Sequence, residues 1–176
     1  MNINIRQESS EDYGQVFGLI KDAFKTELFS HFTEQLLVER LRTSDAFISE
    51  LAMVAEMEGE IIGHILLTTI KINNNKVSYE SLALAPVSVK PAYQNKGVGG
   101  QMILQAHAKA IELGYKSIVL LGHQDYYPRF GYQKASVFGI KLPFDVPDEN
   151  CMAVELVENG LAGVNGIVEY PKGFNE

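Results

Sequence analysis

The spacing of hydrophobic residues predicts the order of helices and strands along the chain. Apolar positions recur at helical spacing after Ser9 or Ser10, from Thr33, and from about Gly97 to Leu113. Strand-like runs cover residues 3–6, 51–57, 61–72, 77–89, 117–121, 132–138, 152–157 and 167–170. A short turn of helix is expected around residues 125–130.

The connections between these elements predict the fold class. Turns containing Gly59 and the triplet Asn73-Asn74-Asn75 join three successive strand runs, which is typical of an antiparallel meander. The run 117–121 is continuously apolar and follows a helix, as expected for a buried parallel strand. The chain is therefore expected to be α/β, with an antiparallel meander that leads into a β-α-β unit.

Length and composition indicate one globular domain and exclude several classes of protein. Of the 176 residues, 46% are hydrophobic and 21% are charged. Fifteen basic and 22 acidic residues give a net charge of −7, which argues against nucleic-acid binding because such proteins need a cationic surface. The longest apolar run, residues 61–70, is interrupted by Gly63 and His64, so no membrane span is expected. The start of the chain lacks a secretory signal, so the expected location is the cytoplasm.

Cysteine and histidine give no indication of a disulfide or a metal site. Cys151 is the single cysteine, and the four histidines have no metal-ligand spacing. We expect His64 to be a core residue, and His31 and His107 to lie at the surface. His123 follows a strand and is a candidate proton relay, although a histidine in that position is more often structural.

The segment 86–100 carries the most informative chemistry. It is a glycine-rich turn between a strand and a helix, where unpaired backbone N–H groups and the helix dipole favour an anion such as phosphate. Lys96 precedes Gly97 with no Ser or Thr at the helix start, so the turn is not a P-loop. Met102 stands where the dinucleotide-binding fingerprint needs a third glycine, so that reading also fails.

Two motifs resemble those of the GNAT superfamily of N-acetyltransferases. The segment Gln94-Asn95-Lys96-Gly97-Val98-Gly99 matches the family's acetyl-CoA signature, and Val87-Ser88-Val89-Lys90-Pro91 precedes it as in the family. The segment Tyr126–Tyr132 matches the second motif, with Tyr127 four residues before Gly131. The resemblance implies an acetyl-CoA-binding core over residues 1–138 and a strand-rich extension of the same domain over residues 139–176. The tail is similar to a poorly characterised branch of predicted N-acetyltransferases.

The resemblance also implies a fold and a set of site residues. The fold would be a mixed, mostly antiparallel sheet with flanking helices, in which strands 77–89 and 117–121 splay apart. The backbone at Val87, Ser88 and Val89 would pair with the pantetheine arm of acetyl-CoA. The pyrophosphate would be held by the turn formed by Gln94, Asn95, Lys96, Gly97, Val98, Gly99 and Gly100. In this role Gln94 would shape the turn and Lys96 would contact the phosphates, whereas Lys90 and Arg129 are surface charges or weaker candidates.

By the same resemblance, Tyr127 would be the general acid that protonates the departing CoA thiolate. The alternative for Tyr127 is a packed aromatic residue, and we expect its neighbour Tyr126 to be structural. The general base stays open. Many relatives carry a glutamate on the strand before the turn, but here Glu80 lies too far upstream and Ala83 occupies the matching position.

The function that the resemblance implies is N-acetyl transfer from acetyl-CoA to a primary amine of a small molecule or peptide, by direct attack in a ternary complex. Two alternatives are a CoA-binding protein without catalysis and an acyltransferase that uses a longer acyl chain. We expect no metal, nucleic-acid or membrane partner, and either a monomer or a homodimer.

Overall fold

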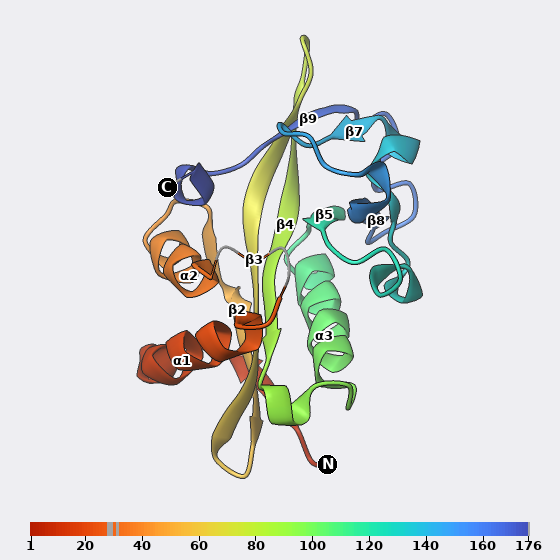
Figure 1. The fold of residues 1–176 in the computed structure, drawn as a ribbon. Helices are drawn as coiled ribbons and strands as arrows, with labels where there is room; N and C mark the ends of the chain where they lie inside the picture. The colour runs from red at the N-terminus through yellow and green to blue at the C-terminus, as the bar shows by residue number, and fades with distance from the viewer. Residues whose placement is uncertain (28–29, 31, 176) are drawn as a thin grey trace.

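A computed structural model describes residues 1–27, 30 and 32–175 of the chain. These residues form a mixed central sheet with helices on both faces (Figure 1). The strands are β1 (Asn4–Gln7), β2 (Phe47–Met57), β3 (Glu60–Asn73), β4 (Ser78–Val89), β5 (Ser117–Leu121), β6 (Gln133–Lys134), β7 (Ile140–Lys141), β8 (Cys151–Glu155) and β9 (Gly166–Glu169). The α-helices are α1 (Tyr13–Phe24), α2 (Glu34–Arg42) and α3 (Val98–Glu112). Short 3-10 turns are η1 (Ser10–Asp12), η2 (Pro91–Tyr93), η3 (Tyr127–Phe130), η4 (Ala135–Phe138), η5 (Asp148–Asn150) and η6 (Lys172–Asn175).

The sheet confirms the predicted fold class. Its strand order is β1-β2-β3-β4-β5-β8-β6, and β9 pairs with both β3 and β7. Strands β1 to β4 form an antiparallel meander, whereas β4 and β5 are parallel. Helix α3 makes the crossover between β4 and β5, so these three elements form the expected β-α-β unit.

The predicted strand over residues 132–138 is wrong. Only β6, of two residues, forms there, and the chain then turns through η4. Ala135 is fully buried in this turn, and the N–H of Gly139, which has a left-handed φ of 74°, donates to Ser136 O at 3.0 Å. Packing of the turn therefore overrides the strand-like character of residues 132–138. Strand β7 was not predicted because two residues give no periodic signal.

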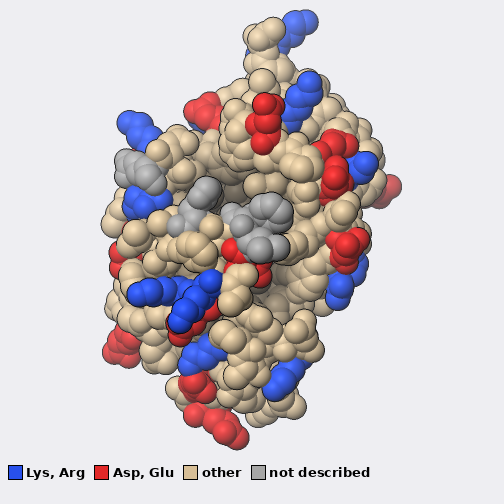
Figure 2. All heavy atoms as spheres, in the orientation of Figure 1, with Lys and Arg blue, Asp and Glu red and all other residues tan. Residues whose placement is uncertain are grey.

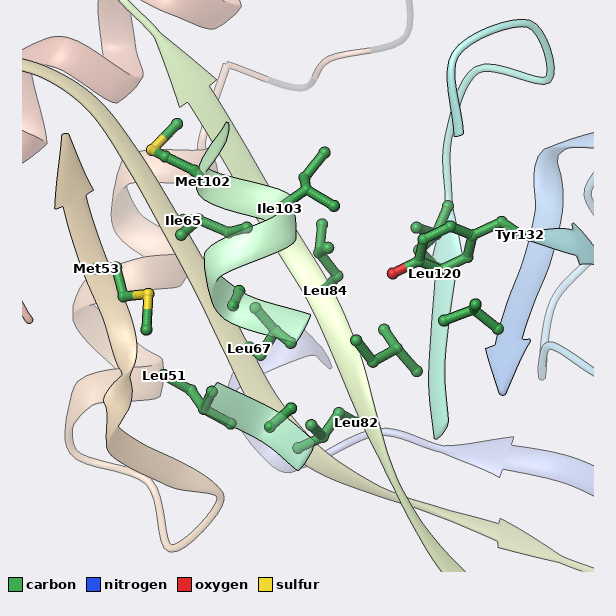
Figure 3. Close-up of a cluster of buried hydrophobic side chains, with 14 of the residues drawn as sticks. Leu51, Met53, Ile65, Leu67, Leu82, Leu84, Met102, Ile103, Leu120 and Tyr132 are labelled. Carbon is green, nitrogen blue, oxygen red and sulfur yellow. The ribbon is translucent and has the colours of Figure 1, made fainter. Parts of the chain in front are cut away.

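Helix α3 covers one face of the sheet. Its buried residues Met102 and Ile103 face Ile65 and Leu84 of β3 and β4 in the largest hydrophobic cluster (Figure 3). This contact fixes the axis of α3 against β4. The start of α3 is consequently held beside the end of β4, where the glycine-rich turn lies.

Helices α1 and α2 cover the opposite face of β2 and β3 (Figure 1). Their apolar side chains form a separate cluster with Leu66 of β3. Since neighbouring strand residues face opposite sides, Ile65 and Leu67 join the α3 cluster while Leu66 joins this one. Burial on both faces explains why β3 is mostly apolar along its length.

Ion pairs fix the start of α1 to the sheet. Arg6 on β1 donates from Nη1 and Nη2 to the two carboxylate oxygens of Asp12, at 2.8 and 2.9 Å, and from Nε to Glu56 of β2 at 2.9 Å. Asp12 also accepts a 2.8 Å hydrogen bond from the N–H of Ser9. The Arg6 hydrogen bonds hold the pKa of Asp12 well below its ordinary value, even though burial opposes the shift.

The C-terminal residues extend the same sheet. Strand β8 pairs with β5 along all five of its residues, and β9 pairs with the far end of β3. A third hydrophobic cluster, which includes Val119, Ala153 and Val168, lies beneath this region. Among the described helices, none combines the length and apolar character needed to cross a membrane.

Candidate active site

The turn between β4 and α3 has the geometry of an anion-binding site. Gly97 is the N-cap of α3 and has a left-handed φ of 83°, a conformation that favours glycine. Asn95 is also left-handed, with φ 61°. The side-chain amide of Gln94 donates to Val89 O at 3.0 Å, which closes the turn onto the last residue of β4.

Several successive backbone N–H groups in this turn are unpaired. The N–H of Gln94 donates to Pro91 O, and the next backbone bond is formed by Gln101, whose N–H donates to Gly97 O at 3.1 Å. Within the described part of the chain, no hydrogen-bond acceptor is found for the N–H groups of residues 95–100. Six successive unpaired donors at a helix N-terminus can bind a diphosphate.

The neighbouring end of β4 exposes further backbone groups. The N–H of Lys90 donates to Ile62 O on β3 at 2.9 Å. Because bonding directions alternate along an antiparallel strand, Ser88 also faces β3, whereas the N–H and C=O groups of Val87 and Val89 point away from it. The acceptance of the Gln94 hydrogen bond by Val89 O agrees with this direction.

Strands β4 and β5 diverge at this level. They pair only at Leu82–Ile118 and Ala83–Val119, near the start of β5. The edge of β4 at Val87 and Val89 therefore lies beyond the β4–β5 pairing, and an extended ligand can pair with it as a strand would. We call this opening between the two strands the fork. The splayed pair expected from the resemblance is present.

The side chain of Ser88 lies away from the fork. Ser88 pairs with His64 of β3, is 2% exposed, and its hydroxyl has no hydrogen-bond partner among the described residues. The backbone groups of Ser88 also face β3, so Ser88, unlike Val87 and Val89, presents no free backbone group to a ligand in the fork.

Aromatic residues after β5 lie against the start of α3. Tyr126 packs edge-on against Tyr127 and Phe130, with ring centroids 5.1 and 5.4 Å apart. The Tyr126 hydroxyl lies 3.0 Å from the position that a Cβ would take on Gly99, and Phe130 lies 3.4 Å from the corresponding position on Gly100. We expect Tyr126 to be structural, and its hydroxyl lies against the glycine-rich turn.

Tyr127 lies deeper in the same aromatic group. Its ring covers Gly122 and packs edge-on against Tyr132, with centroids 5.8 Å apart. Burial, with a smaller contribution from Tyr126 and Glu27, raises the pKa of Tyr127 well above its ordinary value. Its hydroxyl has no protein hydrogen-bond partner within the described residues. The phenol is therefore protonated at neutral pH and free to donate.

The basic residues near the turn differ in what they contact. Lys90 is paired with Glu60, and Arg129 stacks 4.6 Å over the Tyr126 ring. Lys96 lies 5.6 Å over the Tyr93 ring, inside the turn itself. On the face shown in Figure 2, acidic and basic side chains are interspersed.

The environments of two histidines were predicted only in part from the sequence. His64 is fully buried, as expected, and its Nε2 lies 3.3 Å from Glu8 Oε1, next to a buried Glu8–Arg42 ion pair. The expectation of a surface position for His107 is wrong. His107 is partly buried and shares a 2.8 Å hydrogen bond with the Tyr132 hydroxyl, and burial lowers its pKa to about 4. His31 lies outside the described residues.

One contact at the fork has no signal in the sequence. His123 Nε2, two residues after β5, lies 3.6 Å from Glu27 Oε2, which follows α1. The two residues are far apart in the chain and no spacing rule joins them, so only the fold brings them together. No group of His, Cys, Asp and Glu suited to a metal ion is found in the part of the chain that the structure describes.

Comparison with known proteins defines the class of this chain. A sequence model described as an acetyltransferase (GNAT) domain matches residues 4–135, which is most of the chain. The protein therefore belongs to the GNAT family of acetyltransferases, as its motifs indicated.

Individual relatives support this assignment. The uncharacterised N-acetyltransferase YhbS of Escherichia coli K12 is 26% identical over 171 residues, which cover 97% of this chain and 98% of YhbS. YjhQ of the same organism, also uncharacterised, is 33% identical over 127 residues, or 72% of this chain and 70% of YjhQ. A crystal structure of E. coli YhbS in complex with CoA superposes with a TM-score of 0.88 at 25% identity, covering 100% of this chain and 93% of YhbS. A GNAT acetyltransferase from Brucella melitensis in complex with acetyl-CoA gives a TM-score of 0.79 at 28% identity, covering 98% of both chains.

Proposed function

We propose that this protein transfers the acetyl group of acetyl-CoA to a primary amine by direct attack in a ternary complex. The observation that carries the proposal is that two sets of unpaired backbone groups lie next to the same opening in the sheet. The unpaired amides of residues 95–100 and the edge of β4 at Val87 and Val89 adjoin the same fork. The relatives crystallised with CoA or acetyl-CoA add support, since they share this fold.

The residues present fit acetyl-CoA by their free backbone donors and by charge. The amides of residues 95–100 would hold the pyrophosphate, and Gly97, where a Cβ would meet no atom within 4 Å, would leave room for the phosphates at the start of α3. Lys96 lies within this turn and would add a positive charge. When bound, acetyl-CoA supplies a thioester that is already activated for acyl transfer.

The edge of β4 would orient the reacting group. The N–H and C=O groups of Val87 and the N–H of Val89 would pair with the amides of the pantetheine arm, whereas Val89 O already accepts the Gln94 hydrogen bond. An N–H in this stretch would also donate to the thioester carbonyl and stabilise negative charge on its oxygen during attack. Catalysis would then depend mainly on positioning two reactants within the fork.

Tyr127 is the proposed general acid. Its pKa is raised by burial, which keeps the phenol protonated at neutral pH, and its hydroxyl has no competing described partner. The phenol would donate its proton to the departing thiolate.

A covalent mechanism through the single cysteine is disfavoured. Cys151 is 5% exposed, and burial raises the pKa of its thiol to about 11. A buried, protonated thiol is a poor nucleophile. Direct transfer needs no nucleophile from the protein.

The proposal is tested with purified protein, acetyl-CoA and a panel of primary amines, by following thiol release. Tyr127→Phe is expected to lower kcat by at least ~10-fold while CoA affinity, measured by calorimetry, stays within about twofold. Tyr79→Phe, at the far end of β4, is the matched control and should keep normal turnover.

Other outcomes separate the alternatives. CoA binding without amine-dependent thiol release would favour a binding protein over an enzyme. Faster release from propionyl-CoA or succinyl-CoA than from acetyl-CoA would instead identify a longer acyl donor. Normal turnover of Tyr127→Phe would remove Tyr127 as the acid.

A further inference from the structure

The contact between Glu27 and His123 joins two separate segments at the fork. Glu27 lies in the turn after α1, where its N–H donates to Phe24 O at 3.2 Å. His123 lies in the loop after β5, and its Nε2 is 3.6 Å from Glu27 Oε2. The side chains are 69% and 45% exposed for His123 and Glu27 respectively, so a solute can reach both.

The backbone at His123 is held firmly although its side chain is exposed. Preceding it, the N–H of Gly122 donates to Asn150 O at 2.9 Å, and the Asn150 side chain donates back to Gly122 O at 3.0 Å. The His123 carbonyl accepts from the N–H of Tyr126 at 3.1 Å. The imidazole is thus attached to a fixed point at the end of β5.

This fixed point lies on the β5 side of the fork, at the level of the free edge of β4. Strands β4 and β5 are parallel and pair at Leu82–Ile118 and Ala83–Val119. Continuing that register along both strands places His123 close to the level of Val87, where the edge of β4 is free. The proposed acid Tyr127 lies in the same segment, and its ring covers Gly122, the residue before His123.

We propose that His123 is the general base that accepts a proton from the acceptor amine, and that Glu27 is the residue that positions its imidazole. The proposal rests on the proposed function, because it concerns the same reaction. Imidazole is the side chain best suited to accept a proton near neutral pH. A carboxylate beside one ring nitrogen orients the ring and leaves the other nitrogen free to accept.

The other charged groups are less suited than His123 to act as the general base. Asp125 and Arg129 lie on the same segment as His123, and Arg129 stacks over Tyr126. The remaining candidate pair, Glu8 with His64, is sealed from solvent, since their side chains are 2% and 0% exposed. Glu80 pairs with Lys71 at the opposite end of β4, before the strands diverge.

In this reaction protons move from the amine to His123 and from Tyr127 to the departing thiolate. An N–H bond of the entering ammonium breaks, and its proton passes to His123 and then to water. The electron pair left on nitrogen forms the new C–N bond with the thioester carbonyl carbon, and the C–S bond breaks. The thiolate takes the proton of Tyr127. The Tyr127 oxygen then takes the second proton from the amine nitrogen that has formed the C–N bond. The products are the amide, CoA as a thiol and one released proton.

The test compares the wild-type protein with His123→Gln, Glu27→Gln and Glu27→Asp. Thiol release from acetyl-CoA is measured against pH with two probe amines, ethylamine and the much less basic 2,2,2-trifluoroethylamine. With ethylamine, His123→Gln is expected to lower kcat/KM by about 10²-fold or more while CoA affinity is unchanged. With trifluoroethylamine the loss should be much smaller, because this amine is already neutral and needs no proton removed before attack.

Glu27→Gln should reduce the rate with ethylamine by about 10-fold, as expected for a residue that acts through another. Glu27→Asp should recover part of that loss because the carboxylate is retained. Glu158→Gln, which removes an exposed carboxylate after β8, is the matched control and should have no effect.

The outcomes distinguish failure of this inference from failure of the proposed function. A wild-type protein that releases no thiol with any amine would contradict the proposed function. A functional wild-type protein whose activity survives His123→Gln would overturn the role of His123, and so would an equal loss with both amines. Normal activity of Glu27→Gln beside an impaired His123→Gln would overturn the positioning role of Glu27.

Discussion

The approach of Tyr126 to Gly99 gives a prediction that can be measured without any substrate. An alanine Cβ at Gly99 would lie 3.0 Å from the Tyr126 hydroxyl and 3.7 Å from Val89 Cγ2. The second distance is an ordinary contact, whereas the first is too close. The strain in Gly99→Ala therefore comes from one oxygen atom, and Tyr126→Phe removes that atom.

The magnitude follows from two opposing effects. Replacing glycine by alanine in a helix stabilises the fold by roughly 0.5–1 kcal/mol. Displacing the tyrosine ring costs about 1 kcal/mol, at the low end for overpacking. Gly99→Ala should thus be nearly neutral in the wild-type protein but stabilising in the Tyr126→Phe background, with a coupling energy of about 1 kcal/mol between the two sites.

The assay is equilibrium urea unfolding of the four proteins in this double-mutant cycle. Gly18→Ala provides the matched control, because Gly18 lies in helix α1 and a Cβ there would meet no atom within 4 Å. Its effect should add to that of Tyr126→Phe. If the Gly99 cycle is also additive within ~0.5 kcal/mol, the contact does not exist in solution and the placement of Tyr126 at the turn is refuted.

Two further predictions concern pH. Burial lowers the pKa of His107 to about 4 in the folded protein, below the value of about 6.5 in the unfolded chain. As the pH is lowered from about 6.5 to about 4, the unfolded state therefore binds a proton that the folded state does not. The free energy of unfolding should fall over that range by up to ~3 kcal/mol. His107→Gln should flatten that part of a pH series of urea unfolding curves, and an unchanged slope would contradict the burial. The pKa of Asp12 is instead lowered by Arg6, so its contribution is complete above about pH 4 and disappears in acid. Asp12→Asn should cost about 2 kcal/mol at pH 7 and progressively less below pH 4, and a penalty that is constant with pH would argue against the ion pair.

Much of the fold could be predicted because its signals are local. Strand β5 begins and ends as predicted, and α3 lies within the predicted limits of 97 and 113. The glycine-rich turn was recognisable because its glycines and Gln94 determine the backbone directly. Such features depend on neighbouring residues, which the sequence places together.

The remaining features depend on packing between distant segments. Glu27 meets His123, and Tyr126 meets Gly99, only because the helices and the sheet are arranged in one way. His107 was assigned to the surface because its partner, Tyr132, lies 25 residues away. No periodicity describes such contacts, so sequence patterns identified the turn but not the side chains that face it.

The pairing of β5 has a consequence for how the acetyl donor would be held. Strand β5 forms five pairings with β8 but only two with β4. Its position therefore depends mostly on a segment that contains neither motif. A chain shortened before Cys151 would retain every residue of the glycine-rich turn and of the tyrosine segment, yet the second wall of the opening would lose most of its anchorage. The C-terminal region is in this sense part of the donor site, although none of its residues needs to touch the donor.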